Sequence, residues 1–256
     1  MMKRLSILIT LGLLLCATPP AQSQQRRSNQ MIAEARSSNR TTDARVLFNA
    51  WRALQRQNSR NVQRISLVER LNSRFEGPVG TWRSTVDMSV SGYLTSNNWQ
   101  NSVTRILDEG RSVPRNEWNT IAIEWRSLLG EFAPLIEDPA FPLQLFENMT
   151  PSGKARAERI DGEPHWRIEM VPSRGGGPYQ RVTLWVHQEV GYLSRSRAVA
   201  TYNRSSIDVI TDYKRLNGID VPFRRYFEGK VQQRRRTRVS TLFFAVQGDY
   251  TNYLFR

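Results

Sequence analysis

The residues that most often carry chemistry are sparse in this sequence. Its two histidines, His165 and His187, have no further His, Asp or Glu at the spacing of metal ligands. No nucleophile elbow, zinc-protease motif or phosphate loop is present. Paired carboxylates occur at 108–109 and 137–138, beside turn signals that place them in solvated loops. We therefore expect no enzyme activity, no metal and no cofactor.

Tryptophan and methionine side chains could instead line an apolar binding cavity. Such cavities are built from aromatic and flexible apolar side chains. The same residues could also fill an ordinary core, and the sequence leaves both interpretations open. The candidate cavity residues are Trp82, Val86, Met88, Trp125, Trp166, Met170 and Trp185.

The densest basic run is QRRRTR at 233–238. We expect it within one long final strand, so that Arg234, Arg236 and Arg238 share a face. A solvated strand face is one interpretation of this patch. Contact with an anionic membrane or an acidic partner is the other.

The N-terminal segment 1–23 has the parts of a secretory signal peptide, and the elements that position the candidate residues follow it. A short basic start precedes the apolar run 7–16, and small residues at 21–23 provide a cleavage site. The apolar run is too short to span a bilayer. We expect a periplasmic protein. Lipid attachment at Cys16 is the alternative, against which the bulky Leu15 argues.

The export signal determines which anionic partners the net charge of +14 can meet. Cleavage leaves 35 basic residues against 23 acidic ones, a net charge of +12. Inside a cell such a charge would suggest nucleic acid. An exported protein meets anionic lipid headgroups and polysaccharide instead, so we expect a membrane surface and no nucleic acid. Cleavage also removes the only cysteine and, with it, disulfide and thiol chemistry.

After the signal peptide, hydrophobic periodicity defines the elements. Residues 24–42 are polar without periodicity, which predicts a disordered leader. Asp43 can cap an amphipathic helix over about 44–58. The period then changes to two, which predicts paired strands over about 65–76 and 82–90.

The pattern of the sequence after residue 90 predicts mostly strands. Residues 117–132 fit a strand or a helix about equally, and 141–149 resembles a short apolar helix between prolines. In the last hundred residues, segments with strand-like alternation of apolar and polar residues are separated by turn signals such as 217–218 and 228–229. We therefore expect one domain, 43–256, with an antiparallel meander.

One part of this meander resembles a known family. Residues 206–223 read SIDVITDYKRLNGIDVPF, and residues 182–199 read VTLWVHQEVGYLSRSRAV. The alternating strand, the Asp-Tyr pair, the Asn-Gly-Ile turn and the following Val-Pro resemble the bacterial outer-membrane lipoprotein carrier superfamily (LolA/LolB-like, outer-membrane lipoprotein-sorting proteins). The order of signal peptide, helix, strands, helical middle and meander is also similar.

This resemblance implies an α+β fold: a strongly curved antiparallel sheet, like an unclosed barrel, with helices covering its concave face. It implies a periplasmic carrier that holds acyl chains of a lipid or lipoprotein in an apolar cavity, and we expect a monomer. In that family an arginine under the helical lid holds the closed form, and the sequence alone assigns no residue to this role. The alternative is an envelope sensor or adaptor that binds a protein partner with the same fold.

Overall fold

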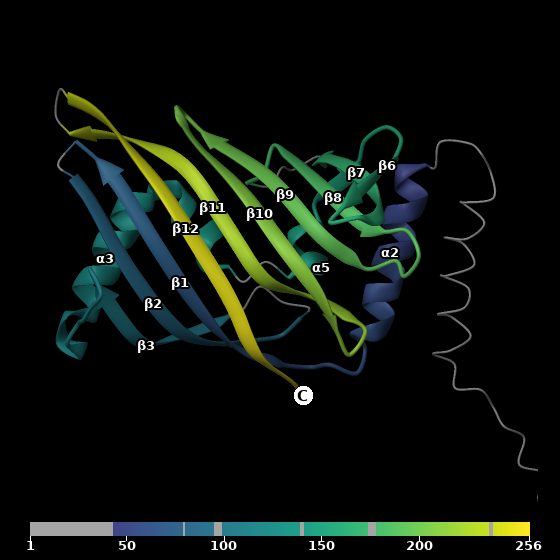
Figure 1. Ribbon diagram of the computed structural model, residues 1–256, viewed down its shortest axis with the longest axis horizontal. Helices are drawn as coiled ribbons and strands as arrows, with labels where there is room; N and C mark the ends of the chain where they lie inside the picture. The colour runs from purple at the N-terminus through teal and green to yellow at the C-terminus, as the bar shows by residue number, and fades with distance from the viewer. Residues whose placement is uncertain (1–42, 79, 95–98, 139–140, 174–177, 236–237) are drawn as a thin grey trace, which may run out of the picture.

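An open antiparallel sheet of twelve strands forms the body of the protein (Figure 1). The computed structural model describes residues 43–78, 80–94, 99–138, 141–173, 178–235 and 238–256. The expected signal peptide and leader therefore lie outside the described residues. The strands are β1 (Ile65–Gly77), β2 (Gly80–Gly92), β3 (Gln100–Asp108), β4 (Arg111–Ser112), β5 (Met149–Pro151), β6 (Arg156–Ile160), β7 (Glu163–Pro172), β8 (Arg181–His187), β9 (Leu193–Tyr202), β10 (Ser205–Leu216), β11 (Ile219–Arg235) and β12 (Arg238–Phe255).

The strand order shows that the sheet is not closed. It runs β4-β3-β2-β1-β12-β11-β10-β9-β8-β7-β5, and β6 pairs with β7. The last strand lies between β1 and β11, so the first and last strands meet in the middle of the sheet. Because β4 and β5 are opposite edges, the predicted unclosed half-barrel is confirmed.

Short helices cover one face of this sheet. The chain between the edge strands β4 and β5 must cross a face to connect them, and Figure 1 shows its helices behind the strands. We call residues 115–138 and 142–145 the cover. It consists of η1 (Arg115–Glu117), α3 (Trp118–Leu129), η2 (Gly130–Phe132), α4 (Ala133–Glu137) and α5 (Pro142–Leu145). None of the helices in the described ranges is long and apolar enough to cross a membrane.

Helix α2 (Ala44–Asn58) packs at the end of the sheet near β5 and β7 (Figure 1). Its predicted cap is confirmed, since Asp43 Oδ1 accepts a hydrogen bond from the main-chain N–H of Arg45 at 2.8 Å. The buried side of the helix carries Ala44, Leu47, Phe48, Ala50, Trp51, Leu54 and Gln55.

The core lies between the sheet and its helices, and strand β1 illustrates how it is built. Its buried residues alternate with more exposed ones, most of them polar, as expected for a strand covered on one face. One member of the buried series is charged: Glu69 lies between Leu67 and Leu71 with no exposed surface.

The C-terminal strands differ from the prediction at Gly229. The expected turn at 228–229 is absent, because both residues pair within β11. A Cβ atom on Gly229 would lie 2.4 Å from the Ser206 main-chain oxygen and 2.7 Å from the Phe244 ring. Glycine is needed there for close packing within the sheet and not for a turn.

The structure settles one open alternative and corrects two expectations. Residues 118–129 are helical, which resolves the ambiguity of the 117–132 segment, and within 141–149 only 142–145 form a helix. The prediction that 233–238 lies within one long final strand is wrong, because β11 ends at Arg235, β12 begins at Arg238, and these two residues pair. Arg234 and Arg238 therefore belong to two antiparallel strands, because the chain reverses between them.

Candidate functional site

Three of the seven candidate cavity residues meet at an apolar hollow of about 120 Å³ between α3 and strands β1–β3. Val86, Met88 and Trp125 contribute to its wall, and the Trp125 indole N–H donates to Ser73 Oγ at 3.1 Å. Pockets for small ligands usually measure about 300–1,000 Å³. The hollow is thus a narrow space beneath a closed cover. Its lining residues are Leu71, Val86, Met88, Asn101, Val103, Ile106, Ile121, Ala122, Trp125, Arg126 and Glu137.

The other four candidates lie elsewhere. Trp82 stacks on Phe75 with ring centroids 5.1 Å apart. Met170 is fully buried near the far end of the sheet, where Trp166 packs partly buried against the core. Trp185 lies on the opposite face of β8 from buried Leu184, and its N–H donates to a carboxylate of β6 at 3.2 Å. The seven residues therefore do not form one cavity, and most of the covered face is a filled core.

The proposed basic patch stays a prediction. Arg236 lies outside the described residues. Arg234 and Arg238 lie on the paired ends of β11 and β12.

A buried arginine fastens the cover to the sheet. Arg225, on β11, has no exposed surface. Its guanidinium donates to the Leu135 main-chain oxygen at 3.1 Å and to the Asp138 main-chain oxygen, at the end of α4. The guanidinium also lies 4.4 Å from the centre of the Phe227 ring. Carbonyls at a helix C-terminus carry partial negative charge, so this cation stabilises the end of α4 on the sheet.

A buried carboxyl group faces the same place from the neighbouring strands. Glu69 of β1 is paired with Tyr250 of β12, and the Tyr250 hydroxyl lies 3.4 Å from Arg225. Within the described residues, neither carboxyl oxygen of Glu69 accepts a hydrogen bond of normal geometry, although the Tyr250 hydroxyl is near. Burial raises the pKa of Glu69 to about 7, against the opposing effects of Tyr250 and Arg225.

Sequence reasoning missed both of these residues, although a local signal exists. On β11, Arg225 occupies a position in the alternating series of buried residues that includes Val221 and Phe227. On β1, Glu69 occupies such a position between Leu67 and Leu71. A charge at an apolar position marks a group that folding must bury. The partner of each charge is set by other parts of the chain, so the pattern alone could not assign a role.

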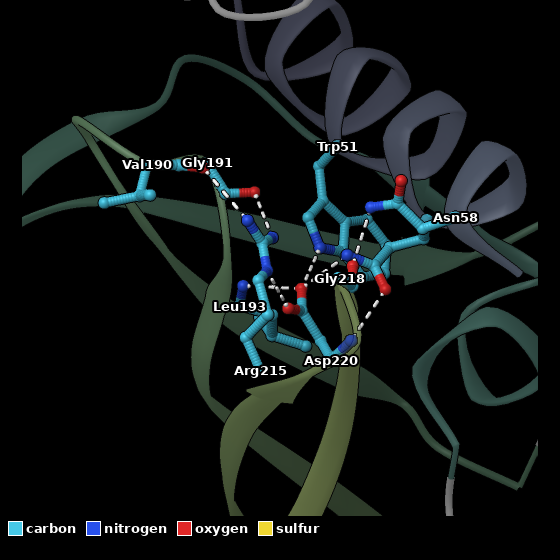
Figure 2. A network of polar contacts seen from close by, with 9 residues as sticks. Trp51, Asn58, Val190, Gly191, Leu193, Arg215, Gly218 and Asp220 are labelled. Atoms are coloured by element: carbon cyan, nitrogen blue, oxygen red, sulfur yellow. Dashed lines mark hydrogen bonds and ion pairs between the residues drawn. The ribbon is translucent and has the colours of Figure 1, made fainter. Parts of the chain in front are cut away.

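A second polar cluster holds α2 against the β10–β11 turn (Figure 2). Asp220 Oδ2 accepts hydrogen bonds from Trp51 Nε1 at 2.9 Å, Gln55 Nε2 at 2.8 Å and the Leu193 main-chain N–H at 2.9 Å. Its Oδ1 accepts from Arg215 Nε at 3.0 Å. We call this group the Asp220 cluster. It uses the Asn-Gly-Ile-Asp segment that carried the family resemblance, so that segment has a structural role here.

The histidines are brought together, which their sequence spacing did not indicate. Both are buried, and their ring centroids lie 5.1 Å apart. His165 Nε2 lies 2.6 Å from Ser194 Oγ, and burial lowers the His165 pKa. Within the part of the chain that the structure describes, no group of three or more His, Cys, Asp or Glu could hold a metal.

Comparisons with known proteins gave structural neighbours only. No family model and no curated protein matches the sequence. A DUF1329 family protein from Desulfovibrio piger is 12% identical, with 84% of this chain and 94% of that chain covered and a TM-score of 0.38. A LolA superfamily protein from Nitrosomonas europaea is 13% identical, with 80% and 92% covered and a TM-score of 0.35.

A further neighbour is an outer membrane lipoprotein-sorting protein domain from Vibrio parahaemolyticus, 9% identical, with 91% and 93% covered and a TM-score of 0.35. One of these neighbours is a protein of the LolA superfamily, which the sequence resembles. Likeness at such identities and TM-scores does not establish a function.

Proposed function

We propose that this protein is a periplasmic carrier that binds acyl chains of a lipid or lipoprotein between the sheet and its cover. The observation that carries the proposal is the way Arg225 is held. This buried cation binds main-chain carbonyls of the cover, and water can replace those bonds when the cover moves. The sheet would then expose apolar side chains, among them those around the hollow beneath α3.

The packing of α3 supports such a movement. Of its twelve residues, only Trp125 and Leu129 are buried. The hollow beneath it is too small for a whole acyl chain, so binding requires α3 to shift away from β1–β3. Each methylene group transferred from water contributes about 0.8 kcal/mol, so a chain of about a dozen carbons contributes close to 10 kcal/mol. This gain exceeds the cost of about 1.5–3 kcal/mol for a lost hydrogen bond to a charged group.

The direct test is mass spectrometry of lipids extracted from protein purified from the envelope of its own cells, with uptake of a fluorescent fatty-acyl probe as the kinetic test. We expect Arg225→Leu to accelerate probe uptake about tenfold, because the cover loses its charged hydrogen bonds. Arg224→Leu is the matched control. Arg224 is the preceding residue of the same strand, and its guanidinium pairs with Asp249 at 3.1 Å on the exposed face.

Absence of retained lipid together with absence of probe binding would refute the carrier function. A protein partner that stays bound after lipid removal, with no acyl binding, would favour the sensor or adaptor function instead. Equal acceleration by Arg225→Leu and Arg224→Leu would refute the role given to the cover.

A further inference from the structure

The hollow beneath α3 has an apolar interior and a charged rim. Eight of its eleven lining residues are apolar, and the other three are Asn101, Arg126 and Glu137. Arg126 Nε donates to Glu137 Oε1 at 2.6 Å, and Asn101 Nδ2 lies 3.4 Å from the Glu137 main-chain oxygen. The Arg126 side chain is 60% exposed, so the polar side of the hollow faces water.

We propose that this hollow, widened by a shift of α3, binds the acyl chain of an anionic single-chain amphiphile, whose carboxylate or phosphate group replaces Glu137 as the partner of Arg126. The inference rests on the proposed function and deepens it by naming the ligand class. The hollow must widen by the shift of α3 to admit even one chain, which favours a single-chain ligand. A single arginine at its rim suits one anionic head group.

The exchange of partners is energetically reasonable. An exposed ion pair contributes about 0–1 kcal/mol, so the present partner of Arg126 is easily displaced. Arginine binds carboxylates and phosphates through two parallel hydrogen bonds, which a ligand tethered by its buried chain can form without a large loss of freedom. Because Glu137 ends α4 and Arg126 lies in α3, the exchange would also release one half of the cover from the other.

The same site disfavours a neutral head group. An alcohol cannot replace the Glu137 carboxylate as a partner for the Arg126 charge. It would leave the ion pair intact and obtain only the gain from burying its chain. Discrimination between head groups on equal chains therefore measures the role of Arg126.

The test compares dodecanoate, dodecyl phosphate and dodecanol as competitors of a bound fluorescent fatty-acyl probe at low salt. We expect both anions to compete about three- to fivefold better than dodecanol. Arg126→Gln should abolish this preference, whereas Glu137→Gln should strengthen binding of the anions more than binding of dodecanol. The relative affinity of the carboxylate and the phosphate then identifies which head group the site prefers.

Arg105→Gln is the matched control. Arg105 lies on the neighbouring strand β3, and its guanidinium pairs with Asp87 at 2.6 Å on the other side of the sheet, so its loss should change nothing. Equal binding of dodecanol and the anions, or equal weakening of all three by Arg126→Gln, would overturn the inference while leaving an acyl carrier. Failure of every probe to bind would overturn the proposed function itself.

Discussion

Two regions of this protein bury charged groups in opposite ways. In the Asp220 cluster, a fully buried carboxylate accepts hydrogen bonds from four donors, and its Arg215 partner also binds the main-chain oxygens of Val190 and Gly191 at 3.2 Å (Figure 2). Beneath the cover, Glu69 accepts no hydrogen bond of normal geometry within the described residues, and Arg225 Nε has no partner there.

The difference separates a fixed contact from a movable one. A fully satisfied polar network specifies one arrangement, since any change leaves a buried group unpaired. A partly satisfied network has less to lose when its elements separate and water enters. We infer that α2 is held permanently at its end of the sheet, whereas the cover can open.

The largest expected effect is on the Asp220 cluster. Asp220→Ala leaves the Arg215 charge and three N–H donors without their shared acceptor, and we expect a loss of about 3–5 kcal/mol in the free energy of unfolding. Urea denaturation followed by tryptophan fluorescence measures it. Asp208→Ala, which removes an exposed ion pair with Arg197, should cost about 0–1 kcal/mol. A loss below about 1 kcal/mol for Asp220→Ala would contradict the permanent contact.

The pH dependence of stability tests the other region. Because its folded pKa of about 7 exceeds the ordinary value of 4.5, the contribution of Glu69 is fully present below pH 4.5 and lost as pH rises through 7. Glu69→Gln should therefore gain about 2–3 kcal/mol relative to the wild-type protein between about pH 5 and 8. Urea denaturation across this range measures the difference.

Glu76→Gln provides the control for this pH effect. Glu76 lies on the same strand in an exposed ion pair with Arg74, so its substitution should change stability by no more than about 0–1 kcal/mol over the range tested. If the Glu69→Gln difference does not change with pH, Glu69 is not the buried acid described here.

Local opening of the cover should respond to Arg225. Arg225→Leu removes charged hydrogen bonds to the Leu135 and Asp138 main-chain oxygens, so hydrogen exchange across 133–138 should accelerate about 10- to 100-fold. Mass spectrometry of peptic peptides measures it, with 44–58 in α2 as the internal reference. Arg224→Leu should leave both segments unchanged. Equal acceleration in α2 would mean global destabilisation and would remove the contrast between the two regions.

The smallest effect concerns the edge of the Asp220 cluster. Asn58 Nδ2 donates to the Gly218 main-chain oxygen at 2.7 Å. Asn58→Ala should cost about 1 kcal/mol, because this part-buried acceptor loses its donor. Asn72→Ala, which removes an exposed bond from Thr85 at 2.9 Å, should change unfolding by less than about 0.5 kcal/mol. Equal effects would show that the α2 contact is no tighter than the exposed surface.

Much of the fold could be predicted from local patterns. Helix α2 and the β1–β2 hairpin agree with their predicted ranges, and the later strands form the predicted antiparallel meander, because hydrophobic period and turn residues act over a few positions. Gly229 misled the prediction, since a glycine needed for close strand packing resembles one needed for a turn. The candidate cavity residues separated for a related reason: their residue types favour burial without specifying where.

The sequence by itself determined that Glu69 and Arg225 occupy positions where the alternating pattern of the strand places apolar residues, because this alternation is local. Only the tertiary structure decided what those charges meet. Pairing of β1 with β12 set Glu69 opposite Tyr250, and the crossing of the cover brought the end of α4 over Arg225. Strand register and helix placement depend on hydrogen bonds and packing between distant segments, which no local pattern contains.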